Sequence, residues 1–213
     1  MIKTIIFDFD GVIVESVDIK TAAFAELFAK EGKDAVKRIV EYHLVNAGIS
    51  RYEKFKHIYQ EILKRGLSEY EFKQLCDRFS ELVMGAVVRA PYVKGAKEFL
   101  ELWYKKYKCF VASATPEAEM QEIVRMKGLV KYFVGVYGAP KKKADVVKDV
   151  IERYHVQPGE IAYVGDAMSD YEAASANGIH FIARIDNNEI IFAGKDCIKM
   201  TDLSGLGNIV DKM

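Results

Sequence analysis

Residues 4 to 12 read Thr-Ile-Ile-Phe-Asp-Phe-Asp-Gly-Val. The apolar residues of this run are continuous rather than alternating, which predicts a buried strand of a parallel sheet over Thr4 to Phe9. Asp8 and Asp10 stand two residues apart, so their side chains point the same way from an extended chain. They lie at the carboxyl end of the strand, where open α/β sheets bind ligands. Two like charges there indicate a bound cation, and the plain alternative is a solvated strand end.

Four further apolar runs have the same character, and helical patterns alternate with them from residue 95 onward. Near residue 115, Thr-Pro-Glu supplies a helix cap, a proline at the first helical position and an acid in the first turn, and Gly128 ends that helix. This alternation predicts an α/β fold with a doubly wound, Rossmann-like parallel sheet. The expected strands are Cys109 to Ala112, Phe133 to Val136, Ile161 to Val164 and His180 to Ala183.

Residues 17 to 88 read as four helical segments without a convincing strand. The first two end at Gly32 and Gly48, and the last two begin at serines followed three residues later by glutamate, which is the pattern of a capping box. We therefore predict a four-helix cap domain at 17–88, inserted into a core domain at 1–16 and 89–213. The insertion leaves just after Asp10, so it should cover the end of the first strand.

Composition limits the class of partner. The 31 basic and 31 acidic residues of the 213-residue chain cancel, so bulk charge gives no reason to expect binding to nucleic acid or to an anionic membrane. Three widely spaced cysteines fit neither a disulfide framework nor a metal knuckle. The first residues leave no room for a signal peptide, and no apolar run reaches membrane-spanning length. We expect a soluble cytoplasmic protein.

Polar residues also follow the later strands. Ser113 follows the second strand, Lys141, Lys142 and Lys143 precede a helix expected near residue 144, and Asp166 follows the fourth strand with Asp170 four residues on. Each signal is ordinary when taken alone. Serine at a strand end is commonly a turn former or helix cap, adjacent lysines are commonly solvated, and Gly-Asp is common in turns.

Taken in order, these fragments resemble the four motifs of the haloacid dehalogenase superfamily, in the subgroup of phosphoglycolate phosphatases and β-phosphoglucomutases with a helical cap. The resemblance covers essentially the whole chain. It implies that Asp8 is the nucleophile, that Asp10 is the general acid and base, and that Ser113 hydrogen-bonds the transferring phosphoryl group. It further implies a lysine that neutralises charge, for which we favour Lys143 with Lys141 as competitor.

The same resemblance implies Mg²⁺ as cofactor. Its ligands would be Asp8, the backbone carbonyl of Asp10 and Asp166, with Asp170 beside the ion or in contact with its ligands. Family members that cleave carbon–halogen bonds lack the second acid, so Asp10 favours phosphoryl transfer. The expected activity is hydrolysis of a small phosphorylated metabolite through an aspartyl-phosphate. A sugar-phosphate mutase of the same superfamily is the nearest alternative, and a receiver-like phosphoacceptor module is a more distant one.

In this family a helical insertion closes over the substrate and selects the leaving group. The candidate substrate residues are His43, Arg51 and Lys54. His43 lies on the apolar stripe of its helix, so a satisfied core histidine is the alternative. Arg51 and Lys54 lie in the first turn of a helix, where positive charge opposes the macrodipole and indicates a nearby anion. The alternative for Arg51 is a surface pair with Glu53 or Glu81.

Overall fold

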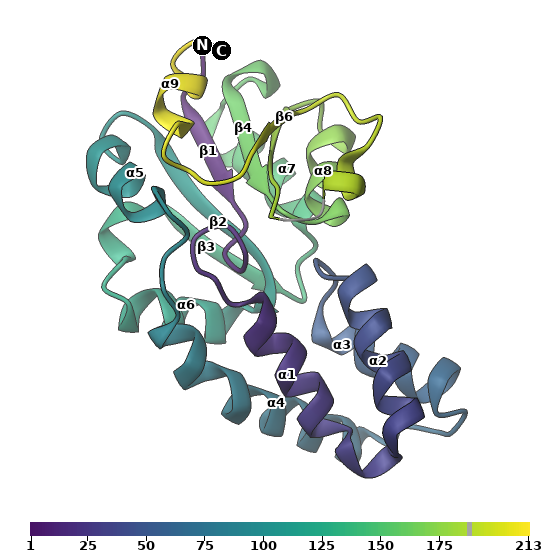
Figure 1. Cartoon of the computed structure of the whole chain (residues 1–213). Helices are drawn as coiled ribbons and strands as arrows, with labels where there is room; N and C mark the ends of the chain where they lie inside the picture. Colours follow the sequence, from purple (N-terminus) through teal and green to yellow (C-terminus); the bar gives the residue numbers. More distant parts are fainter. Residues whose placement is uncertain (187–188) are drawn as a thin grey trace.

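Strand β1 (Thr4–Phe7) lies in the middle of a six-stranded parallel sheet, which confirms the predicted α/β class (Figure 1). The structure is a computed structural model that describes residues 1–186 and 189–213. The strand order is β3-β2-β1-β4-β5-β6, so the chain builds the sheet outward from β1 first on one side and then on the other. The remaining strands are β2 (Lys108–Pro116), β3 (Gly135–Ala139), β4 (Ile161–Gly165), β5 (His180–Arg184) and β6 (Ile198–Met200).

Helices cover both faces of the sheet because side chains of each strand alternate between the faces. Ile5 and Phe7 of β1 belong to a core shared with helices α5, α6 and α9, whereas Ile6 belongs to the core beneath α7 and α8. These helices are α5 (Ala96–Trp103), α6 (Glu117–Met126), α7 (Lys143–Tyr154), α8 (Met168–Ala176) and α9 (Leu206–Val210). Short 3₁₀ turns occupy Ala29–Glu31, Val130–Tyr132, Pro158–Glu160 and Glu189–Phe192.

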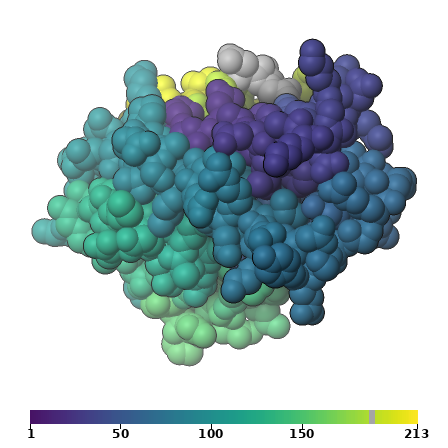
Figure 2. All heavy atoms as spheres, turned by 90° about the horizontal axis from the view of Figure 1, so that it is seen from below, coloured from purple at the N-terminus to yellow at the C-terminus, as the bar shows by residue number. Residues whose placement is uncertain are grey.

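Residues 17–89, called here the helical insertion, contain the four α-helices that the sequence predicts. They are α1 (Val17–Leu27), α2 (Lys33–Val45), α3 (Arg51–His57) and α4 (Glu69–Arg89), with a π-helical turn at Ile58–Ile62. The rings of Phe24, Phe55 and Phe79 pack together at centroid distances of 4.8 to 5.9 Å and hold three of these helices against one another. Seen from below, purple and blue atoms of the insertion spread across this face and meet the teal atoms of the core (Figure 2).

The ends of the insertion helices follow the predicted capping pattern in part. Ser68 and Glu71 form a full capping box, as predicted. At Ser50 the serine half forms, with its Oγ accepting from the Glu53 N–H at 3.4 Å.

Several predicted boundaries are wrong. Strand β1 ends at Phe7, because the chain turns at once and the Ile13 N–H donates to the carbonyl of Phe9 at 2.9 Å. Strand β2 continues to Pro116, so Thr115 lies in the strand and Pro116 at the N-cap position of α6. The third strand begins two residues later than predicted, and the three-residue strand β6 at the sheet edge was not predicted.

Two further features concern the cysteines and the lengths of the helices. Cys76, Cys109 and Cys197 are free thiols. Of the helices in the described ranges, none has the length and apolar character needed to cross a bilayer.

Candidate active site

The candidate site lies where the strand order reverses, at the carboxyl ends of β1, β2 and β4. Phe7 pairs in register with Val111 of β2 on one side and with Val164 of β4 on the other. Asp8 therefore emerges level with the next residues of both neighbours, and its N–H donates to the carbonyl of Val164 at 2.9 Å. Because parallel strands end at one edge, Asp8, Ser113 and Asp166 are delivered to the same place.

Two glycines allow the close approach of backbone and carboxylates here. Gly11 has φ +75° and packs against Asp166, so a Cβ at this position would overlap the Asp166 carboxylate. A Cβ at Gly165 would overlap the side chain of Asp170 in the same way. Glycine is thus needed after Asp10 and before Asp166 because a larger residue would overlap a carboxylate-bearing side chain.

Asp8 is buried and held on both carboxylate oxygens. Its Oδ1 accepts from the Phe9 N–H at 2.6 Å, and its Oδ2 accepts from Lys143 Nζ at 2.7 Å. Burial, together with the charges of Asp170 and Asp10, raises the pKa of Asp8 to about 7 despite the opposing effect of Lys143. A further positive charge at this point would favour the nucleophilic, ionised form.

Lys143 is the first residue of α7, and its ammonium group bridges two acids. Its Nζ lies 2.7 Å from Asp8 Oδ2 and 2.7 Å from Asp170 Oδ1. Burial opposes the charged form, but the two carboxylates hold the pKa of Lys143 above its ordinary value. Lys141 pairs instead with Asp149, and Lys142 is exposed. Of the three adjacent lysines, the structure places Lys143 on the predicted nucleophile.

The carboxylates of Asp8, Asp166 and Asp170 form a cluster. One oxygen of each lies within 4.8 Å of the others. Asp170 is fully buried, and its Oδ2 accepts from the Ala167 N–H at 3.1 Å. Burial and the charges of Asp8 and Asp170 raise the pKa of Asp166 well above its usual range. Three acids with a single lysine leave excess negative charge, and carboxylate oxygens are the ligands that Mg²⁺ prefers, so these residues fit the predicted ion.

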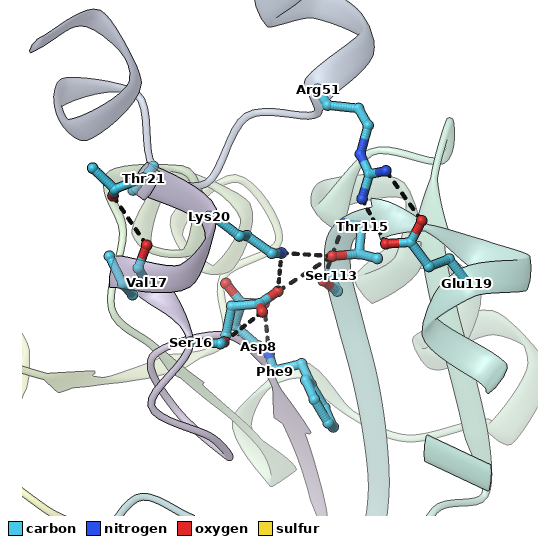
Figure 3. A network of polar contacts seen from close by, with 12 residues as sticks. Asp8, Phe9, Ser16, Val17, Lys20, Thr21, Arg51, Ser113, Thr115 and Glu119 are labelled. Atoms are coloured by element: carbon cyan, nitrogen blue, oxygen red, sulfur yellow. Dashed lines mark hydrogen bonds and ion pairs between the residues drawn. The ribbon is translucent and has the colours of Figure 1, made fainter. Parts of the chain in front are cut away.

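Asp10 has a separate set of partners. Its Oδ1 accepts from Ser16 Oγ at 2.6 Å, and its Oδ2 accepts from Thr115 Oγ1 at 3.2 Å and pairs with Lys20. Burial raises the pKa of Asp10, but Lys20 outweighs it and, with the hydroxyls, holds that pKa below its ordinary value. Figure 3 shows Lys20 reaching from α1 toward Thr115 on β2, which accepts from Lys20 Nζ at 2.7 Å.

Sequence reasoning missed both of these partners. The sequence predicts a helix cap at Thr115, whereas the side chain of Thr115 contacts Asp10. Lys20 lies in the first turn of α1, where positive charge opposes the macrodipole. Positive charge near a helix N-terminus draws attention to Arg51 and Lys54 in the sequence, and the same signal marks Lys20.

Ser113 and His43 reach the same cavity from opposite sides. A cavity of about 370 Å³ is lined by Asp8, Asp10, Asp166 and Ser113 from the core and by His43 from α2. Ser113 is buried, and its Oγ accepts from the Thr115 N–H at 3.1 Å. A second cavity of about 370 Å³ also touches Ser113 and extends past Lys143 toward Ser50.

The loop that follows α2 is seated on the core. Ser169 Oγ donates to the carbonyl of Gly48 at 3.1 Å. A Cβ at Gly48 would overlap the Ser169 hydroxyl. The insertion therefore touches the N-terminus of α8, next to Asp170.

The other two predicted substrate residues lie deeper. Lys54 is 2% exposed and contacts His43, with its Nζ 2.9 Å from His43 Nδ1. Arg51 is buried against Glu119 of α6, with Nη2 2.6 Å from Oε1 and Nη1 3.0 Å from Oε2. The predicted surface pairing of Arg51 with Glu53 or Glu81 is wrong. The predicted contact of Arg51 with substrate is not supported either, because an acid of the core already occupies its guanidinium.

Comparisons with known proteins identify the family of the chain. The model of the haloacid dehalogenase-like hydrolase family matches residues 5–184. A phosphorylated carbohydrates phosphatase from Thermotoga maritima is 28% identical over 186 residues, covering 84% of this chain and 83% of that protein. A phosphoglycolate phosphatase from Nitrosospira multiformis is 28% identical over 194 residues, with 84% and 81% covered.

Solved structures show the same fold. A β-phosphoglucomutase from Clostridium difficile superposes with a TM-score of 0.80 at 19% identity, covering 100% of this chain and 97% of its own. Because the family model spans most of the sequence and includes both Asp8 and Asp166, the chain belongs to the haloacid dehalogenase-like hydrolase family.

Proposed function

We propose that this hydrolase is a magnesium-dependent phosphatase that cleaves a small phosphomonoester through an aspartyl-phosphate on Asp8. The observation that carries the proposal is the placement of Asp8 and Asp10 on one cavity, each with its own donors. A nucleophilic carboxylate and a second acid within the same pocket match the two halves of phosphate ester hydrolysis. The names of the two phosphatase relatives support the same class of substrate.

In the first step a carboxylate oxygen of Asp8 attacks phosphorus, and the bond from phosphorus to the alcohol oxygen breaks. Asp10 gives its proton to that oxygen, so the product leaves as a neutral alcohol. In the second step water attacks the phosphorus of the aspartyl-phosphate, Asp10 takes a proton from the water, and the Asp8 carboxylate is released with inorganic phosphate. Lys20 and Ser16 stabilise the carboxylate form of Asp10, which is the form that the second step requires. The proton that Asp10 takes from water in that step is the one that it gives to the leaving oxygen in the next turnover.

The remaining residues bind and orient the phosphoryl group. Ser113 Oγ would donate to one transferring oxygen, and Lys143 would neutralise charge on the same group while holding Asp8 in place. Asp8, the backbone carbonyl of Asp10 and Asp166 would hold Mg²⁺, with Asp170 beside it, and the bound ion would offset the charge shared by phosphate and carboxylates.

The test is phosphate release from a panel of small phosphorylated metabolites with Mg²⁺, with and without excess chelator. Chelation should stop turnover without unfolding the protein, because a site of few carboxylates does not staple the fold. Rapid quenching followed by peptide mass spectrometry should find the phosphoryl group on Asp8. Full activity in chelator, or a phosphoryl group on another residue, contradicts the proposal.

The same panel distinguishes a phosphatase from a sugar-phosphate mutase. A mutase remains an alternative because the chain shares its fold with a β-phosphoglucomutase. A mutase would isomerise a sugar phosphate in the presence of a bisphosphate and release little phosphate. The receiver-like alternative is not supported, because the matching family is one of hydrolases.

A further inference from the structure

Lys54 is a buried lysine whose amino group contacts no carboxylate within the described ranges of the chain. Its Nζ lies 2.9 Å from His43 Nδ1, 3.4 Å from the carbonyl of His43 and 3.3 Å from the carbonyl of Ala47. Three acceptors thus surround the three protons of an ammonium group. The hydrogen bonds are satisfied, but the charge is not neutralised, and a buried charge without a counter-charge is unfavourable.

When Lys54 carries its proton, its contact with Nδ1 assigns the tautomer of His43. Because Nδ1 accepts from Lys54, the ring proton resides on Nε2. The imidazole is 4% exposed and stacks on Phe24 with centroids 4.5 Å apart, so the ring is fixed in orientation. Its Nε2 is buried and has no hydrogen-bond partner among the residues that the structure describes. A buried donor without an acceptor is uncommon, so this N–H is available to a partner outside the described residues.

His43 also forms part of the wall of the active-site cavity, which Asp8 and Asp10 share. Burial and the charges of Lys54 and Lys20 lower the pKa of His43 to about 3, so the ring is a neutral donor near pH 7. Burial and the charges of Lys20 and Lys143 lower the pKa of Lys54 to about 7. An anion in the cavity would oppose both effects, because its charge would favour the protonated forms of His43 and Lys54.

We propose that His43 Nε2–H, with its ring oriented by Lys54, binds an anionic oxygen on the leaving group of the substrate. This inference rests on the proposed phosphatase function and narrows its substrate class. The substrates are phosphomonoesters whose alcohol carries a carboxylate or a second phosphate on a short chain, because one cavity of about 370 Å³ must hold both ends. His43 is the specificity residue that touches substrate, and Lys54 is a positioning residue that acts through it.

The experiment compares four substrates of similar length. Ethyl phosphate offers no acceptor, 2-hydroxyethyl phosphate offers a neutral one, phosphoglycolate offers a carboxylate, and ethane-1,2-diol bisphosphate offers a second phosphate. Each is assayed with Mg²⁺ on the wild type and on His43→Leu, His43→Gln and Lys54→Met. Lys56→Met is the matched control, because Lys56 is an exposed lysine on the same helix.

The measured quantity is the kcat/KM ratio of each substrate to ethyl phosphate on one preparation, which cancels any difference in the folded fraction. The wild type should prefer at least one anionic substrate by about tenfold or more, and which one identifies the source of the anion. His43→Leu and Lys54→Met should lower that ratio by about ten- to a hundredfold, the range for a hydrogen bond to a charged group. His43→Gln keeps an N–H and should retain part of the preference, and Lys56→Met should change nothing.

The melting temperature of the Lys54 variant distinguishes a positioning role of Lys54 from a purely structural one. Lys54→Met removes a buried charge without a counter-charge, so its melting temperature should equal or exceed that of the wild type while its selectivity falls. Unchanged ratios in both His43→Leu and Lys54→Met overturn the inference. So does a wild type that prefers 2-hydroxyethyl phosphate to both anionic compounds. If none of the four substrates releases phosphate, the inference is overturned, whereas the proposed function is decided by the metabolite panel described above.

Discussion

Arg51 of α3 and Glu119 of α6 form a two-pronged ion pair that joins the helical insertion to the core (Figure 3). Their side chains are 4% and 10% exposed. Ser80 Oγ binds both partners, at 2.7 Å from Arg51 Nη1 and 2.6 Å from Glu119 Oε2, and the guanidinium lies 4.5 Å from the ring centre of Phe79. The pair fixes α3, which also carries Lys54, relative to the active site.

Breaking this pair should destabilise the protein strongly. Arg51→Met leaves the Glu119 carboxylate buried without its partner, which should cost roughly 3–5 kcal/mol of unfolding free energy. The double variant Arg51→Met with Glu119→Met should recover most of that loss, because no unpaired charge remains. Urea unfolding measures both, and Arg65→Met, which breaks the more exposed pair with Glu31, is the control and should have a small effect. Equal losses in the single and double variants would contradict a paired role.

Gly11→Ala should remove activity beyond its effect on stability. The new Cβ would strain the backbone at φ +75° and would also overlap the carboxylate of Asp166. Gly32→Ala is the matched control, since Gly32 has φ +88° and open space around it. Both variants should lose about 1 kcal/mol or more of stability from the left-handed backbone. Only Gly11→Ala should lose turnover per folded molecule, and similar specific activities would argue against a close Gly11–Asp166 packing requirement.

Asp8→Asn should abolish turnover while the fold remains, because the amide keeps the shape of the carboxylate but lacks its nucleophilic charge. Deamidation must be excluded by mass spectrometry. Asp18→Asn, which changes an exposed acid on the rim of the same cavity, should leave turnover near that of the wild type. Substantial activity of freshly purified Asp8→Asn would rule out covalent catalysis at this residue.

Alanine substitutions of the three adjacent lysines should differ sharply in their effect on turnover. Lys143→Ala removes the ammonium that contacts Asp8, so kcat should fall at least about a hundredfold. Lys142→Ala removes an exposed side chain and should be nearly silent. Lys141→Ala should weaken only the pairing with Asp149 on α7. A crippled Lys141→Ala with an active Lys143→Ala would show that the wrong lysine has been assigned.

His43 should make stability depend on pH. The unfolded histidine takes up a proton near pH 6.5, whereas folded His43, with its pKa lowered to about 3, does not. The unfolded state therefore binds more protons between these values, and stability falls as pH decreases through 6.5. Between pH 7 and pH 5 the wild type should lose roughly 1–2 kcal/mol more than His43→Leu in urea unfolding. Equal losses would mean that His43 titrates normally in the folded protein.

The sequence predicted the elements whose signals are local. Strand β1 and the acids that follow it could be predicted because a buried parallel strand is continuously apolar and its end is marked by Asp8. The four insertion helices could be predicted from periodicity and from caps such as Ser68 with Glu71. Strand β6 could not, since its three residues at the sheet edge are largely exposed and carry no such pattern.

Pairings between distant residues escaped prediction. Arg51 and Glu119 lie 68 positions apart, and nothing in either neighbourhood indicates the other. Thr115 precedes Pro-Glu, so its local context is that of a helix cap even though its hydroxyl contacts Asp10. The sequence could not decide whether His43 is a core residue or a cavity residue. In the structure it is both, because it packs on Phe24 in the insertion core and also lines the cavity.

The seating of the Gly48 loop on Ser169 has a practical consequence for redesign. That contact uses a main-chain carbonyl and the absence of a side chain, so it does not depend on the identity of the loop's other residues. The contact between Gly48 and Ser169 thus positions the loop relative to the core, and the side chains of the other loop residues can vary separately. The loop residues 46 and 47 should accept substitutions that recognise other alcohols, provided that position 48 stays glycine.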